Sequence, residues 1–95
     1  MSIQIQSIHF TAANRLKVLI NKKLNKLFRI NHKILDTKVF LKIDNPDTFS
    51  NKIVEVKLNT SSSIFFAKKT SKSFENSIDL VFQALRKQII RNKQK

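Results

Sequence analysis

The C-terminal stretch, residues 73–95, is patterned as one long amphipathic helix, and this element limits how the rest of the chain can fold. Its apolar side chains recur at steps of three and four residues, so at ~100° per residue they share roughly a third of the circumference: Phe74, Ile78, Val81, Phe82, Leu85 and Ile89. Ser73 is the expected N-cap. No acid follows Asp79, so we expect one side of the helix to cover a core and the other to present positive charge.

The net charge of +13 in 95 residues is the strongest signal in the composition. A polyanionic partner is therefore expected, with nucleic acid ranked above an anionic membrane and above a basic surface that serves only solubility. The chain has no cysteine and no glycine. This excludes disulfides, thiolate metal sites, thiol catalysis and glycine-rich phosphate loops.

The length and the opening residues of the chain indicate a single domain, residues 1–95, located in the cytoplasm. Residues 1–10 alternate polar and apolar side chains without a basic leader segment, so no secretory signal is expected. No apolar run approaches the ~18–20 residues that a membrane span requires. The absence of cysteine fits a reducing compartment.

Patterns upstream of the last helix predict four strands and one further helix. Residues 2–8 alternate as a half-buried strand, and Thr11 is the expected cap of a helix over about residues 12–29. Three more strands follow, at residues 36–43, 52–59 and 64–69. The order β-α-β-β-β-α predicts an α+β domain, in which a four-stranded mixed sheet carries both helices on one face and leaves the other face open.

Positive charge is concentrated on the two predicted helices. Residues 1–35 contain no acid, and the first helix places four cations within a ~60° arc beside its apolar arc: Arg15, Lys22, Lys26 and Arg29. The alternative is an ordinary solvated face, but like charges four residues apart, as at Lys22 and Lys26, destabilise a helix. All six acids lie within residues 36–79 among seven cations. We therefore assign the positive surface to the helices and not to the sheet.

Catalysis and metal binding are not expected from this sequence. His9 and His32 are the only histidines, and neither has a motif partner. Carboxylates do not pair on a predicted helix or strand as acid–base catalysis requires, and the chain offers too few clustered nitrogen, sulfur or carboxylate ligands for a metal ion. The prediction is a protein that is not an enzyme and that uses no cofactor.

Two features stay open at this point. Four apolar residues are expected on the open face of the sheet: Phe40, Ile53, Ile64 and Phe66. They either stack on the bases of single-stranded RNA or pack on one another and stay partly exposed. Leu80 and Ile90 fall outside the apolar stripe of the last helix and mark either a partner contact or the edge of the sheet.

Three stretches carry a family resemblance: MSIQIQSIHF at the start, INKKLNKL at residues 20–27, and SFENSIDLVFQALRKQIIRNK near the end. Their most specific residues, with one more in the last strand, are Lys23-Leu24, Lys26-Leu27, Ala67, Ile78-Asp79, Leu85, Lys87-Gln88-Ile89 and Arg91. The sequence resembles the short ribosome hibernation-promoting factor family, also called ribosome-associated inhibitor A or protein Y. This resemblance implies the same β-α-β-β-β-α fold, similar to double-stranded RNA-binding domains with an added first strand.

The resemblance also implies a function and a set of contacts. Members of this family bind the small ribosomal subunit between its head and body, where messenger and transfer RNA would sit, and hold idle ribosomes inactive as part of a stress response. Contacts to ribosomal RNA come from basic side chains on both helices, which here match Lys22, Lys23, Lys26, Lys87, Arg91 and Lys93. The charge map adds three more residues to the predicted site: Arg15, Arg29 and Arg86.

The sequence departs from the family pattern at three places. The turn at residues 60–63 has threonine and serine where the family has glycine, so its backbone geometry is a point to test. Ala84 stands where a lysine is often found. No C-terminal dimerisation domain like that of the long form follows, so we expect a monomer off the ribosome that does not pair ribosomes by that route.

The predicted function is thus translation inhibition by occlusion of the channel for messenger and transfer RNA, with the small ribosomal subunit as partner and no small-molecule substrate. One alternative is a generic double-stranded nucleic-acid-binding protein. Another is a protein-interaction module that uses the open sheet face.

Overall fold

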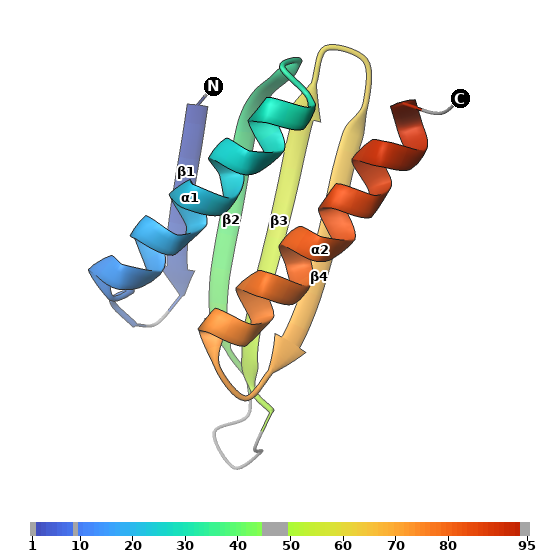
Figure 1. The fold of residues 1–95 in the computed structure, drawn as a ribbon. Coiled ribbons are helices and arrows are strands. Elements are labelled where there is room, and N and C mark those ends of the chain that lie inside the picture. Colours follow the sequence, from blue (N-terminus) through green and yellow to red (C-terminus); the bar gives the residue numbers. More distant parts are fainter. Residues whose placement is uncertain (1, 9, 45–49, 94–95) are drawn as a thin grey trace.

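The computed structural model describes residues 2–8, 10–44 and 50–93, apart from the side chain of Lys93. Its elements are β1 Ser2–Ile8, α1 Asn14–Ile30, β2 Ile34–Ile43, β3 Lys52–Thr60, β4 Ile64–Ser71 and α2 Phe74–Lys93 (Figure 1). The predicted order of elements is confirmed. Among the helices described, none combines the length and the apolar character that crossing a membrane requires.

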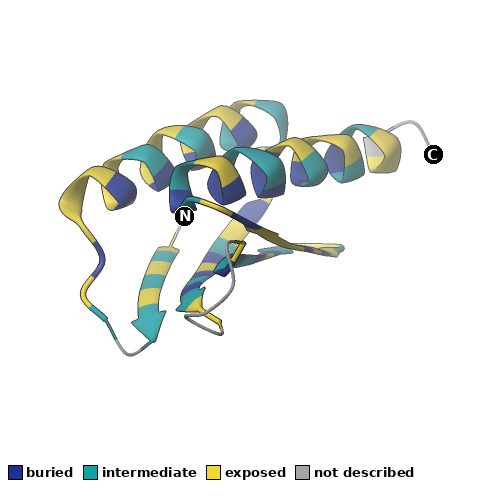
Figure 2. Cartoon of the chain, turned by 90° about the horizontal axis from the view of Figure 1, so that it is seen from below, coloured by how far each residue is buried: buried dark blue, intermediate teal, exposed yellow. Residues whose placement is uncertain are grey.

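The strands form one mixed sheet in the order β1-β2-β3-β4. β1 and β2 pair in parallel and are connected through α1, whereas β2, β3 and β4 form an antiparallel meander. Figure 2 shows that both helices lie on one side of the sheet and that the opposite side is uncovered. This arrangement confirms the predicted α+β architecture.

The core lies between the helices and the sheet. α1 turns Leu16, Ile20, Leu24 and Leu27 inward, and α2 buries all six residues of its predicted apolar stripe. The central strands contribute alternate residues: Val39, Leu41, Val54, Val56 and Leu58. Burial of one large aliphatic side chain contributes about 1.5–3 kcal/mol, so this shared core holds α1 and α2 in fixed positions over the sheet.

The two helix starts differ from each other in how they are capped. Ser73 caps α2 as predicted, because its Oγ accepts a hydrogen bond from the backbone N–H of Asn76 at 3.1 Å. The prediction for Thr11 is wrong: α1 begins at Asn14, and its N-cap is Ala13, which has no side-chain oxygen. Ala12 is buried in the core, and Ala13 is extended. The chain therefore stays extended past Thr11 and starts the helix later.

Three predicted strands are longer in the structure, and β3 gains only Thr60 at its end. β2 begins at Ile34 rather than at residue 36, and its register against β3 shifts between Ile34 and Asp36. This irregularity breaks the alternation that would have identified the strand start. β4 continues to Ser71, whose buried hydroxyl lies 2.8 Å from the hydroxyl of Ser77 in α2.

The turn between β3 and β4, for which the resemblance implied a glycine, is closed by a side chain. The Thr60 hydroxyl accepts a hydrogen bond from the backbone N–H of Ser63 at 2.8 Å. The backbone N–H of Thr60 donates to the Ser63 carbonyl, also at 2.8 Å. Threonine hydroxyls stabilise turns in this way, which accounts for a closed turn in a chain without glycine.

Replacing each of the two cap candidates tests these assignments. Ser73→Ala should lower the free energy of unfolding by about 1 kcal/mol, because the N–H of Asn76 loses its acceptor. Thr11→Ala should change it by less than about 0.5 kcal/mol, because Thr11 is exposed and caps no helix. Urea denaturation followed by circular dichroism measures both. Equal losses would contradict the placement of the α1 start.

Candidate nucleic-acid interface

The predicted cations of α1 lie on the side of the helix away from the sheet and toward α2. The apolar arc of α1 faces the core, and the four exposed cations follow it on one flank at ~100° per residue: Arg15, Lys22, Lys26 and Arg29. The direction of this flank is fixed by contacts. Arg15 forms an ion pair with Glu75 of α2, and Lys26 lines a hollow shared with α2.

The predicted cations of α2 are divided between its two flanks. Arg86 faces α1 and lines the same hollow as Lys26. Lys87 and Arg91 face the other way and line a second hollow against β4. Lys93 lies in the last turn of α2, but its side chain is outside the described part of the chain. The structure thus brings Lys26 and Arg86 together and places Lys87 and Arg91 apart from them.

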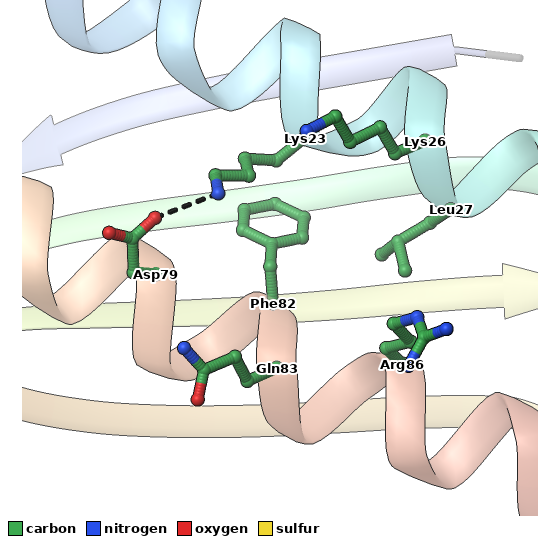
Figure 3. Close-up of a pocket in the computed structure, with 7 residues that line it drawn as sticks. All are labelled: Lys23, Lys26, Leu27, Asp79, Phe82, Gln83 and Arg86. Atoms are coloured by element: carbon green, nitrogen blue, oxygen red, sulfur yellow. Dashed lines mark ion pairs between the residues drawn. The ribbon is translucent and has the colours of Figure 1, made fainter.

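The hollow between the helices, which we call the seam hollow, has a volume of about 120 Å³ and is lined by Lys23, Lys26, Leu27, Asp79, Phe82, Gln83 and Arg86. Figure 3 shows Lys23 reaching from α1 past the ring of Phe82 toward Asp79 on α2. The Nζ of Lys23 lies 2.9 Å from Oδ1 of Asp79. One end of the seam is therefore compensated by the Lys23–Asp79 pair, while Lys26 and Arg86 leave the other end basic.

Both acids of α2 are paired with cations of α1. Besides the Lys23–Asp79 pair, the guanidinium of Arg15 lies 3.3 Å from Oε1 of Glu75. Such exposed pairs contribute about 0–1 kcal/mol each, so they orient the helices more than they stabilise them. The other predicted cations with described side chains form no ion pair within the described chain: Lys22, Lys26, Arg29, Arg86, Lys87 and Arg91. The helical surface keeps most of its positive charge.

The open sheet face has a more balanced charge. Glu55 lies at its centre and contacts the ammonium groups of Lys42 at 3.4 Å and Lys68 at 3.6 Å. Asp36 accepts a hydrogen bond from the side-chain amide of Asn59 at 2.9 Å. Glu55 therefore compensates two lysines of this face, and Asp36 adds a second negative charge there.

The apolar residues of the open sheet face lie where the alternation predicted. Phe66 is 51% exposed and Ile64 is 66% exposed, while Phe40 and Ile53 are half-buried. Phe66 stands opposite Lys57 of β3 in the register. No aromatic stacking partner of Phe66 or Phe40 is present in the described chain. These two rings do not pack against each other as a stacked pair.

The histidine that the structure describes, His32, lines neither of the two hollows of the helical side. His32 is exposed, and its ring meets the ring of Phe28 edge-on with centroids 5.2 Å apart. His9 lies outside the described residues. Over the described ranges no group of three metal-ligating side chains comes together.

Lys69 is a basic residue of the helical side that the sequence patterns did not identify. Lys69 belongs to β4, yet it lines the hollow of about 380 Å³ beside α2 together with Lys87 and Arg91. The assignment of positive charge to the helices alone is therefore wrong at this position. Counting by twos from buried Phe65 and Ala67 reaches Lys69, so the alternation contained the signal.

Comparison with known proteins gives a family and a fold. The family model for sigma 54 modulation protein / S30EA ribosomal protein matches residues 3–95. A ribosomal subunit interface protein from Coxiella burnetii has a similar structure, with a TM-score of 0.88, 23% identity and 100% of both chains covered. The N-terminal domain of Thermus thermophilus protein Y has a TM-score of 0.81 at 18% identity, covering 96% of this chain and 98% of that one. Comparison with curated protein sequences finds no match.

Removing the carboxylate of the Lys23–Asp79 pair tests which surface of the protein binds nucleic acid. Asp79→Asn should leave the free energy of unfolding within about 1 kcal/mol and should raise affinity for a labelled RNA duplex severalfold at low salt, because the ammonium of Lys23 is released. Filter binding measures the affinity. The matched control is Asp36→Asn, which removes the same charge from the open sheet face. Equal gains in the two variants would show that net charge, and not the helical surface, governs binding.

Proposed function

Since this chain belongs to the sigma 54 modulation protein / S30EA ribosomal protein family, we propose that it binds the small ribosomal subunit and blocks the channel for messenger and transfer RNA. It is a ribosome hibernation factor that inhibits translation. The observation that carries the proposal is the helical surface, where six exposed cations of α1 and α2 form no ion pair within the described chain. Phosphate groups of ribosomal RNA are the partners that suit them.

The mechanism is occlusion and involves no chemical step. Contacts from lysine and arginine to phosphates position a protein without reading base sequence. Specificity then comes from the fit between the layer of two helices and a cleft in the folded RNA. The buried stripes of α1 and α2 keep the two rows of cations at a fixed spacing. The two helices therefore do not have to rearrange on binding. The protein acts in the cytoplasm and is a monomer off the ribosome.

The salt dependence of binding should reveal the phosphate contacts. If about six cations neutralise phosphates, log K should fall against log salt with a slope near −5, which is about a 10³-fold loss between about 50 and 200 mM salt. Co-sedimentation with purified small subunits at several salt concentrations measures this slope. A slope close to zero would contradict the proposal and would favour a protein partner on the open sheet face.

Charge reversal on the helices tests the assignment of the surface. The triple variant Lys22→Glu, Lys26→Glu and Arg91→Glu should weaken binding to small subunits by at least about 100-fold with an unchanged circular dichroism spectrum. The control reverses three exposed lysines of the strands, which lie in neither helix: Lys38, Lys57 and Lys68. It has the same net charge and should bind far better. Co-sedimentation of the first variant at moderate salt would show that the helical surface is not the interface.

A competition experiment separates this proposal from a generic double-stranded nucleic-acid-binding protein. An excess of RNA duplex should displace the protein only weakly from small subunits, because the shape of the cleft contributes to the affinity. Preference for the free duplex would favour the generic binder instead.

A further inference from the structure

The hollow between α2 and β4, which we call the edge groove, is separate from the seam hollow. It lies on the flank of α2 that faces away from α1, and it shares only Gln83 with the seam hollow. Its volume is about 380 Å³ and its lining residues are Lys69, Leu80, Gln83, Ala84, Lys87, Gln88 and Arg91. Leu80, which lay off the predicted apolar stripe, is thus part of this groove.

A lysine of β4 reaches the helical side because β4 is the edge strand of the sheet. Phe65, Ala67 and Ser71 are buried toward the helices, and Lys69 occupies the same row between them. Its neighbour in β3 is Val54, which is fully buried. On a central strand this position would be apolar. At the edge, the aliphatic stem of lysine lies along the apolar surface while its ammonium stays in water.

The walls of the edge groove carry one sign of charge. Lys69 comes from β4 while Lys87 and Arg91 come from α2, and no lining residue is acidic. None of these three cations forms an ion pair with a carboxylate of the described chain. The groove is also braced, because the side-chain amide of Gln88 donates to the carbonyl of Phe66 at 2.8 Å. Like charges held close together without a counter-charge are unfavourable, and an anion that enters the groove removes this repulsion.

We propose that the edge groove binds a segment of RNA phosphodiester backbone, and that Lys69 is a phosphate-binding residue. This rests on the proposed function and extends it. The RNA contacts continue around α2, from the seam with α1 to the edge of the sheet. A phosphate fits the three cations, and the apolar side chains of Leu80 and Ala84 offer a surface for the attached ribose.

Lys69 also has a purely structural role to be separated from this one. An inward-pointing charge on an edge strand prevents the strand from pairing with another sheet. A charge of either sign serves that purpose, because both require solvation. Only a positive charge binds phosphate. Reversal of the charge therefore distinguishes the two roles.

The experiment uses the full chain and purified small ribosomal subunits at several salt concentrations. Lys69→Glu should weaken binding roughly tenfold and should make the slope of log K against log salt shallower by about 1. Lys69→Arg should bind within about twofold of the original protein, because it keeps the charge. The matched control is Lys38→Glu on the open sheet face, where the lysine is also exposed, and it should change binding much less.

Equal effects of Lys69→Glu and Lys38→Glu would overturn the groove proposal. A loss of affinity with an unchanged salt slope would also overturn it, because that result indicates contact with a protein surface. Lys26→Glu in the seam reports on the proposed function separately: if it weakens binding and Lys69→Glu does not, only the groove assignment fails. If neither variant weakens binding, the proposed function fails as well. Lys69→Gln, with gel filtration and circular dichroism on every variant, shows whether folding or self-association causes a loss.

Discussion

The burial of two apolar helix stripes against one face of a mixed sheet is the interaction on which the whole structure depends. α1 and α2 share a core with β2, β3 and β4 that includes Leu24, Ile78 and Leu85, all fully buried. Because one side of each helix packs in this core, the remaining surface of the helices faces solvent. The basic residues occupy that remainder, so the same packing that stabilises the fold also places the cations on the helical side, in the seam and on the far flank of α2.

The acids of the chain are placed so that this surface stays positive. Glu75 and Asp79, near the start of α2, pair with Arg15 and Lys23 of α1 and connect the two helices where they lie side by side. Farther along α2 no acid follows. The repulsion between cations is thus reduced near the start of α2 and remains toward its end. The helical layer is therefore most positive toward the end of α2, where it attracts a polyanion most strongly.

Much of the fold could be predicted from the sequence, because the relevant signals are local and periodic. The alternating strands and the apolar stripe of α2 were predicted, and so was the cap at Ser73. Thr11 was misjudged because α1 begins only at Asn14, after the buried Ala12 and the extended Ala13, and no local pattern reports on a buried alanine before a helix. The start of β2 was missed because a register shift interrupts its alternation.

The arrangement of the candidate site was less accessible to sequence reasoning. Arg86 and Lys87 are adjacent in sequence and lie on opposite flanks of α2, and which flank meets α1 depends on the position of β1 at the far edge of the sheet. Lys69 was overlooked because a lysine in an alternating strand is ordinarily read as pointing to solvent on the open face. A lysine can point toward the helical side only on an edge strand, where its ammonium stays in water. Which strand lies at the edge is decided by the tertiary structure.

The central claim is that the helical side of the molecule, and not the open sheet face, binds ribosomal RNA. Chemical labelling of lysine ammonium groups, compared by mass spectrometry between the free protein and its complex with small ribosomal subunits, tests it most directly. The account predicts strong protection at Lys22, Lys26 and Lys87, with Lys38 and Lys57 of the sheet still reactive. Protection of the sheet lysines with continued labelling of the helical ones would contradict it.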